Sequence, residues 1–163
     1  LKNDFETNGI SPDYIVTATG SGGTQGGLVV GSKLFDLPGQ VVAFNVCDDA
    51  EYFDNKIRED VAFWKQSYNM ELNEDDLDIC TIEGYVGPGY GTADKEVFKT
   101  IAELARIEGL FLDPVYTGKA FHGMVNEIQK GAEGRLPRAS NVVFVHTGGL
   151  FGVFPQQQNF KFD

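Results

Sequence analysis

The chain has 163 residues, enough for one domain with one core, and its 24 Asp and Glu outnumber its 13 Lys and Arg, for a net charge of −11. Its 42% hydrophobic and 12% aromatic residues are typical of a folded protein and exclude a disordered tail. The acidic surplus opposes partnership with nucleic acid or with an anionic membrane, because such binding depends on clustered Lys and Arg.

No stretch of about 18 apolar residues occurs, and the first twenty residues contain several charges where a signal peptide needs an apolar run. Cys47 and Cys80 both lie in apolar, strand-like segments, which predicts two reduced core thiols rather than a disulfide. We therefore expect a cytoplasmic protein.

The first half of the chain alternates between strand and helix patterns. A β-branched run at 14–19 precedes a glycine-rich loop at 20–27 and a helix over 28–35, which Pro38 and Gly39 end. The next strand is predicted at 41–46. Apolar residues then recur at helical spacing from 50 to about 70, at Phe53, Ile57, Val61 and Trp64.

The second half continues the same alternation. Its predicted elements are a strand at 77–82, a Gly- and Pro-rich loop at 84–91, a helix over 92–107 closed by Gly109, extended chain at 111–116, a helix over 120–131, a strand at 141–146 and a surface extension at 155–163. Strands that lack polar alternation and alternate with helices indicate a parallel sheet with helices on both faces. Residues 1–163 are thus predicted to form a single α/β domain.

The loop from Ser21 to Gln25 follows a strand and opens a helix. Its backbone N–H groups and the hydroxyls of Ser21 and Thr24 can surround a phosphate, aided by the helix dipole. The pattern matches neither a Walker motif nor a complete GxGxxG fingerprint, and a tight turn without a ligand is the alternative.

Two further motifs place a hydroxyl beside a glycine, namely DPVYTGKA at 113–120 and HTGG at 146–149. In this order the glycine loop, DPVYTGKA and HTGG resemble the carboxyl-terminal half of the D-cysteine desulfhydrase and 1-aminocyclopropane-1-carboxylate deaminase family. These are pyridoxal-phosphate enzymes of fold type II, within the tryptophan synthase β superfamily. The resemblance implies a Rossmann-like sheet in the large domain of a two-domain chain about twice this length, and a homodimer.

The resemblance also assigns residues to the cofactor and the substrate. Those matched to binding of pyridoxal phosphate are Ser21, Gly22, Gly23, Thr24, Gln25, Thr117 and Thr147. Of these, Thr147 matches the position whose hydroxyl faces the pyridine nitrogen in the wider superfamily. Tyr90 in GPGYG and Tyr116 match tyrosines that face the substrate, and packing aromatics are the alternative for both.

Two positions depart from the deaminase pattern. The deaminases carry Glu where this chain has Thr117 and Leu where it has Thr147. A hydroxyl at the ring nitrogen leaves the ring neutral, and a neutral ring is a weaker electron sink that favours prompt loss of a β-leaving group. Both departures therefore indicate the desulfhydrase reaction, which breaks D-cysteine into pyruvate, ammonia and sulfide.

The family's Schiff-base lysine lies in its amino-terminal half, and no lysine of this chain has the matching surroundings. The segment alone is therefore expected to be inactive. We expect Lys119 to be solvated at a helix start and His122 and His146 to be packed, and no spacing of His, Cys or Asp predicts a metal site. The acidic clusters at 48–51 and 74–76 are predicted to be a helix start and a solvated turn.

Two other functions stay open at this stage. One is ring-opening deamination of 1-aminocyclopropane-1-carboxylate. The other, of a different class, is a non-catalytic module that binds a phosphorylated metabolite through Ser21–Gln25.

Overall fold

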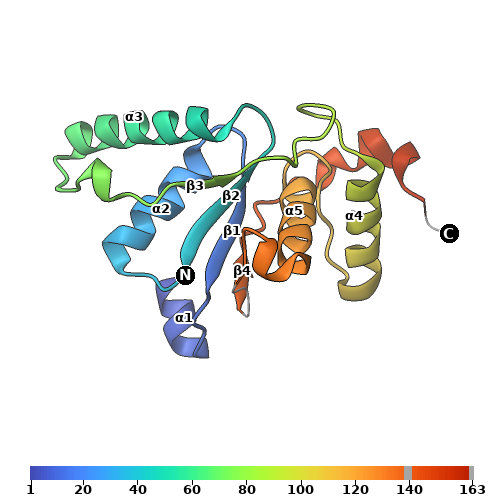
Figure 1. The fold of residues 1–163 in the computed structure, drawn as a ribbon, viewed down its shortest axis with the longest axis horizontal. Helices are drawn as coiled ribbons and strands as arrows, with labels where there is room; N and C mark the ends of the chain where they lie inside the picture. Colours follow the sequence, from blue (N-terminus) through green and yellow to red (C-terminus); the bar gives the residue numbers. More distant parts are fainter. Residues whose placement is uncertain (138–140, 162–163) are drawn as a thin grey trace.

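The computed structural model describes residues 1–137 and 141–161, and at its centre is a parallel sheet (Figure 1). Its strands are β1 (Tyr14–Thr19), β2 (Gln40–Asn45), β3 (Cys80–Ile82) and β4 (Val142–Phe144). They lie in the order β3-β2-β1-β4, and every neighbouring pair is parallel. The predicted α/β fold with a parallel sheet is confirmed.

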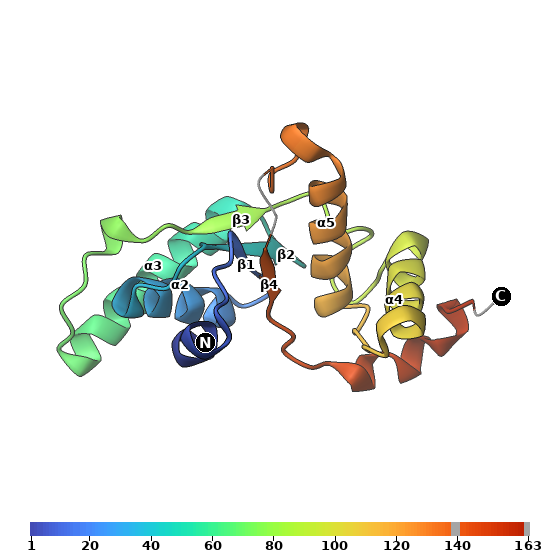
Figure 2. The same ribbon diagram turned by 90° about the horizontal axis from the view of Figure 1, so that it is seen from below.

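Helices cover both faces of this sheet, as the two views show (Figures 1 and 2). One face packs against α1 (Lys2–Asn8), α2 (Gly23–Phe35) and α3 (Ala50–Tyr68), and the other against α5 (Thr117–Gln129), with α4 (Lys95–Glu108) beside α5. Among the described residues, no helix combines the length and the apolarity that crossing a membrane requires.

Alternate residues of each strand point to opposite faces, which creates two cores. Ile15 and Val41 pack with Ile57 and Val61 of α3 on one side. Val16 and Phe44, with other residues of β1 and β2, pack against α5 on the opposite side. Because both faces are buried, the strands read as continuous apolar runs, and this is why their positions were predictable.

The ends of α3 and α4 follow local capping chemistry. The side chain of Asp49 accepts a hydrogen bond of 2.8 Å from the backbone N–H of Tyr52, and this cap starts α3. Gly109 ends α4 with φ of 69°, a left-handed conformation that glycine adopts without strain. The predicted acidic helix start at 48–51 and the predicted glycine cap at 109 are both confirmed.

The structure differs from the predictions in several segments. Helix α2 begins at Gly23 rather than at 28, so most of the predicted glycine loop is the first part of the helix, and α4 begins at Lys95 rather than at 92. Helix α1 was not predicted, and it is anchored by the buried side chain of Phe5. Residues 111–116 form a loop and turn rather than extended chain, and α5 begins at Thr117 rather than at 120. The tail forms the 3-10 helix η4 (Phe154–Asn159), and Phe160 stacks edge-on against Phe98; residues 162 and 163 of the predicted extension lie outside the described residues.

The buried carboxylate of Glu127 ties α5 to two neighbouring segments. It accepts hydrogen bonds from the hydroxyl of Tyr85 at 2.6 Å, the ammonium of Lys130 at 2.7 Å and the backbone N–H of Arg135 at 2.8 Å. Burial acts to raise the pKa of this carboxyl group, but the three donors outweigh it and lower the pKa to about 2.

We expect this cluster to make stability sensitive to acid. The pKa of Glu127 falls from 4.5 in the unfolded chain to about 2 in the fold, so its contribution, roughly 3 kcal/mol, is complete above the unfolded pKa and is lost as the pH falls toward the folded one. Urea denaturation should show a deficit for Glu127→Gln that shrinks by roughly half between about pH 6 and about pH 3. A deficit that stays constant over this range would contradict the assignment, and the exposed Glu103→Gln serves as control.

Candidate functional site

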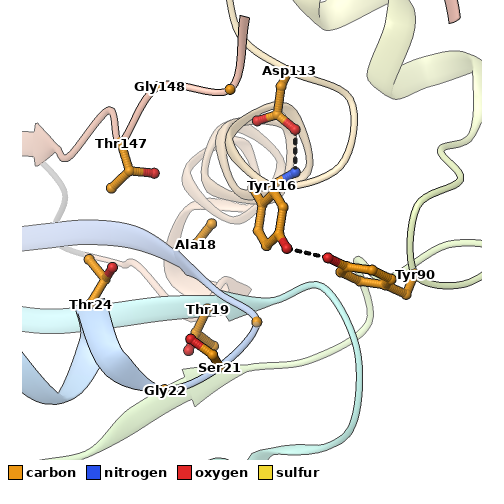
Figure 3. Close-up of a pocket in the computed structure, with 12 residues that line it drawn as sticks. Ala18, Thr19, Ser21, Gly22, Thr24, Tyr90, Asp113, Tyr116, Thr147 and Gly148 are labelled. Carbon is orange, nitrogen blue, oxygen red and sulfur yellow. Dashed lines mark hydrogen bonds between the residues drawn. The ribbon is translucent and has the colours of Figure 1, made fainter. Parts of the chain in front are cut away.

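A pocket of about 500 Å³ opens beyond the carboxyl end of β1 (Figure 3). Parallel sheets commonly bind ligands in this place, because loops and helix N-termini converge there. Four segments contribute to its wall, and the residues are Ala18, Thr19, Gly20, Ser21, Gly22, Thr24, Tyr90, Asp113, Tyr116, Thr147, Gly148 and Gly149. The structure therefore brings the three sequence motifs to a single site.

The first segment is the turn from β1 into α2. Gly22 precedes the helix with φ of 82° and is buried, and a Cβ there would lie 3.4 Å from Ile57 Cγ1. No side-chain cap hydrogen bond is formed at this helix start, so the N–H groups of its first turn keep their capacity to bind an anion. The hydroxyl-bearing residues Ser21 and Thr24 are exposed beside them.

The predicted phosphate loop divides into residues that line the pocket and residues that do not. Ser21, Gly22 and Thr24 are in its wall, whereas Gly23 is exposed outside it. The side chain of Gln25 is fully buried, and its Nε2 donates a hydrogen bond of 2.8 Å to Thr81 Oγ1 on β3. The side chain of Gln25 thus fixes the start of α2 to the sheet instead of facing a ligand.

The second segment is organised by Asp113, which the sequence analysis did not single out. Its buried carboxylate accepts hydrogen bonds from the backbone N–H groups of Val115 at 2.7 Å, Tyr116 at 2.8 Å and Thr117 at 2.8 Å. Three backbone donors on one carboxylate fix the turn that starts α5. An Asp before a Pro and four residues ahead of the helix was the available sequence signal.

Thr117 is hydrogen-bonded to the same carboxylate. Its hydroxyl donates to Asp113 Oδ1 at 2.7 Å and accepts from the backbone N–H of Asp113 at 3.0 Å, and its side chain is buried. Thr117 was matched to cofactor binding, but the pocket wall does not include it. The reason is physical, since the buried Thr117 hydroxyl at the start of α5 is hydrogen-bonded to the Asp113 carboxylate.

Tyr90 and Tyr116 lie beside each other in the pocket wall, with a hydrogen bond between their hydroxyls (Figure 3). Their rings are perpendicular to within 11°, at an interplanar angle of 79°, with centroids 5.9 Å apart. The hydrogen bond with Tyr90 and burial together raise the pKa of Tyr116 to about 12, so its phenol keeps its proton at neutral pH. A Cβ on Gly20 would lie 2.8 Å from Tyr116 Cε1, and only glycine leaves room for the ring.

The last segment is the turn after β4, where Thr147 is exposed in the pocket wall. His146 shapes this turn, because its Nδ1 accepts from the N–H of Gly148 at 3.0 Å and its Nε2 donates to the carbonyl of Phe111 at 2.9 Å. A Cβ on Gly149 would lie 2.8 Å from the carboxylate of Asp113. The turn therefore packs directly against Asp113. His146 is exposed, so hydrogen bonds at both ring nitrogens hold it instead of the packing that was expected.

Lys119 was expected to be solvated, and this expectation is wrong. Its side chain is fully buried, and its ammonium donates to the carbonyls of Val86 at 2.7 Å and Gly89 at 2.9 Å. Burial lowers its pKa, while the charges of Asp94, Cys47 and Asp113 act in the opposite direction. The error arose because a lysine at a helix start is usually outward-facing, whereas here the inner side of α5 carries it.

We expect Asp113→Asn to destabilise the turn that starts α5. The amide replaces one acceptor oxygen by a donor that faces backbone N–H groups, so the free energy of unfolding should fall by about 2 to 4 kcal/mol. Urea denaturation measures this loss, with the exposed Glu103→Gln as control. An Asp113→Asn variant as stable as its parent would show that the carboxylate does not hold the turn.

Comparison with known proteins identifies the family. Residues 4–148 match the family model described as "Pyridoxal-phosphate dependent enzyme". The chain belongs to this family of pyridoxal-phosphate enzymes. The family resemblance of the three motifs and the cofactor class are confirmed.

The relatives carry the two activities that the motifs suggested. The chain is 36% identical to the mitochondrial bifunctional D-cysteine desulfhydrase/1-aminocyclopropane-1-carboxylate deaminase of Arabidopsis thaliana, over 93% of this chain and 36% of the relative. It is 35% identical to the D-cysteine desulfhydrase of Klebsiella pneumoniae (strain 342), over 86% of this chain and 41% of the relative.

A solved structure described as an ACC deaminase homologue has the same fold, with a TM-score of 0.81 and 29% identity over 96% of this chain and 46% of that chain. This similarity confirms fold type II. The chain spans less than half of the length of each of these proteins.

The pocket fits pyridoxal phosphate on structural grounds. The uncapped start of α2 and the hydroxyls of Ser21 and Thr24 form an anion cradle suited to the phosphate. The hydroxyl of Thr147 supplies a hydrogen-bond donor in the same pocket, as a pyridine nitrogen requires.

Proposed function

We propose that this chain forms the carboxyl-terminal portion of a two-domain pyridoxal-phosphate enzyme that acts on a small amino acid, by β-elimination of D-cysteine to pyruvate, ammonia and sulfide. One observation carries the proposal: a single pocket joins the uncapped start of α2, the Tyr90–Tyr116 pair and Thr147. The names of two relatives include this activity.

In this proposal the chain's own residues hold the cofactor at two ends. The first N–H groups of α2, with Ser21 and Thr24, bind the phosphate, and the hydroxyl of Thr147 donates to the ring nitrogen. When bound, pyridoxal phosphate supplies an electron sink for the bonds of the substrate α-carbon. Because the Thr147 hydroxyl is uncharged, it would leave the pyridine ring neutral, and a neutral ring is a weaker electron sink than a cationic one.

The tyrosine pair serves the substrate. With its pKa near 12, Tyr116 keeps a proton on its hydroxyl oxygen at neutral pH and can donate it in a hydrogen bond to a substrate carboxylate or to a departing sulfur. The hydroxyl of Tyr90 is hydrogen-bonded to that of Tyr116, and Tyr90 is the more exposed of the two. Together they place proton donors on one wall of the pocket.

Thr147 is the residue that favours the desulfhydrase reaction over ring-opening deamination. This residue lies in the pocket wall, where its hydroxyl can act on a ligand. Thr117 is the other departure from the deaminase pattern. Its hydroxyl is hydrogen-bonded to Asp113, so it can influence the reaction only through the structure of the helix start.

The remaining parts of the site are assigned outside these residues. Among the described residues, no lysine lines the pocket, and the chain spans less than half of each relative. We therefore propose that the Schiff-base lysine comes from the family's amino-terminal half and that this segment alone is inactive. We also propose that the intact protein is a cytoplasmic homodimer.

The decisive assay uses the protein as its gene encodes it, supplied with pyridoxal phosphate. We expect D-cysteine to yield sulfide and pyruvate in equal amounts, measured by colorimetry and by coupled lactate dehydrogenase. Ammonia from 1-aminocyclopropane-1-carboxylate without sulfide from D-cysteine would replace the proposal with the deaminase. Binding of phosphate esters without turnover of either amino acid would indicate the non-catalytic module.

A second measurement addresses the phosphate cradle alone. We expect the double substitution Ser21→Ala with Thr24→Val to raise the Kd for pyridoxal phosphate by about 10- to 100-fold, because two hydrogen bonds to a charged group are lost. Absorbance titration gives the Kd. Ser32→Ala, on the same helix but outside this pocket, should leave it unchanged. Equal affinities for all three proteins would remove Ser21 and Thr24 from the cradle.

A further inference from the structure

Lys119 is a buried cation that the roles proposed so far do not use. It is among the largest side chains of the structure that are fully buried, and it does not line the pocket. Its ammonium donates to the carbonyls of Val86 and Gly89, both in the loop that carries Tyr90. Burying an ammonium is costly, so an apolar side chain would serve better if filling space were its only role.

The loop that receives these hydrogen bonds is rich in glycine, and within it the N–H and the hydroxyl of Thr92 also donate to the carbonyl of Gly89, at 3.3 and 3.2 Å. Gly84, Gly87, Gly89 and Gly91 all have positive φ, and such a glycine-rich backbone loses much conformational entropy when it is fixed. The carbonyls on either side of Tyr90 are both held from outside the loop. Lys119 binds the carbonyl of Gly89, and Nε2 of Gln156 donates to the carbonyl of Gly91 at 3.2 Å.

Lys119 and Tyr116 belong to the same helix start. Tyr116 is the residue before α5, and Lys119 is the third residue of that helix. The ammonium therefore fixes the loop of Tyr90 relative to the helix that positions Tyr116. The carboxylate of Asp113 fixes the other member of the pair, because it accepts a hydrogen bond from the N–H of Tyr116.

We propose that Lys119 is a positioning residue that holds the hydroxyl of Tyr90 against the hydroxyl of Tyr116 by binding the carbonyls of Val86 and Gly89. The positioning is a property of this chain alone, and its consequence for catalysis rests on the proposed function. Lys119 touches neither substrate nor cofactor, and it acts through the backbone of the loop.

The test reads the tyrosine pair directly in the protein as its gene encodes it. Tyrosine labelled with ¹³C at Cζ reports hydrogen bonding of each phenol by NMR at neutral pH, and Tyr90→Phe provides the signal of Tyr116 without its partner. We expect the Tyr116 signal of Lys119→Met to move to its position in Tyr90→Phe, while Tyr14, Tyr52 and Tyr68 stay in place. The exposed Lys99→Met is the matched control and should change none of them.

A Tyr116 signal that keeps its parental position in folded Lys119→Met would overturn the proposal. Should Lys119→Met fail to fold, Lys119→Gln gives the same reading, because the shorter neutral side chain cannot hold both carbonyls. The expectation and the overturning result are the same for this variant.

A kinetic cycle then separates positioning from a general structural role. We expect Lys119→Met to lower kcat by about 10- to 100-fold with KM changed less, and to have an effect of about twofold or less in a Tyr90→Phe background. An equal loss in both backgrounds would contradict action through Tyr90. A shift of the Tyr116 signal without any turnover in the parent protein would leave the positioning intact and reject the proposed reaction instead.

Discussion

The carboxylate of Asp113 is the contact on which the other parts of the site depend. It accepts hydrogen bonds from the backbone N–H groups of Val115, Tyr116 and Thr117, so it sets where α5 begins and how Tyr116 enters the pocket. The turn after β4 leans on the same carboxylate through Gly149. One buried carboxylate thus contacts segments that lie more than thirty residues apart in sequence.

The electrostatics of the pocket follow from backbone groups rather than from basic side chains. The protein carries a net charge of −11, and neither Lys nor Arg is in the wall of the pocket among the described residues. Attraction for an anion comes from the N–H groups at the start of α2, which act over a short range. Meanwhile the negative charge of Asp113 is compensated by its own helix start, so it opposes a bound phosphate less than a free carboxylate would.

The sequence predicted the elements that follow a simple apolar periodicity. It did not predict the orientation of polar side chains for which several hydrogen-bond partners were available. β1, β2 and the Phe53–Ile57–Val61 stripe followed from apolar runs and helical spacing, and the convergence of Tyr90, Tyr116 and Thr147 followed from family motifs. The side-chain partners of Gln25 and Thr117 were not predicted and the burial of Lys119 was predicted wrongly, because a polar residue near a helix start can face inward or outward. Only the tertiary partners Thr81, Asp113 and the 86–89 carbonyls decide between these orientations.

The glycines of the pocket have a consequence for how this site can change. Gly20 and Gly149 present bare backbone to the Tyr116 ring and to Asp113, so any side chain there would collide with the scaffold before it reached a ligand. Selectivity on this wall therefore depends on its few exposed side chains, chiefly Ser21, Thr24, Tyr90 and Thr147. A new substrate preference can evolve on this half of the site through a handful of positions, while the frame behind them is closed to variation.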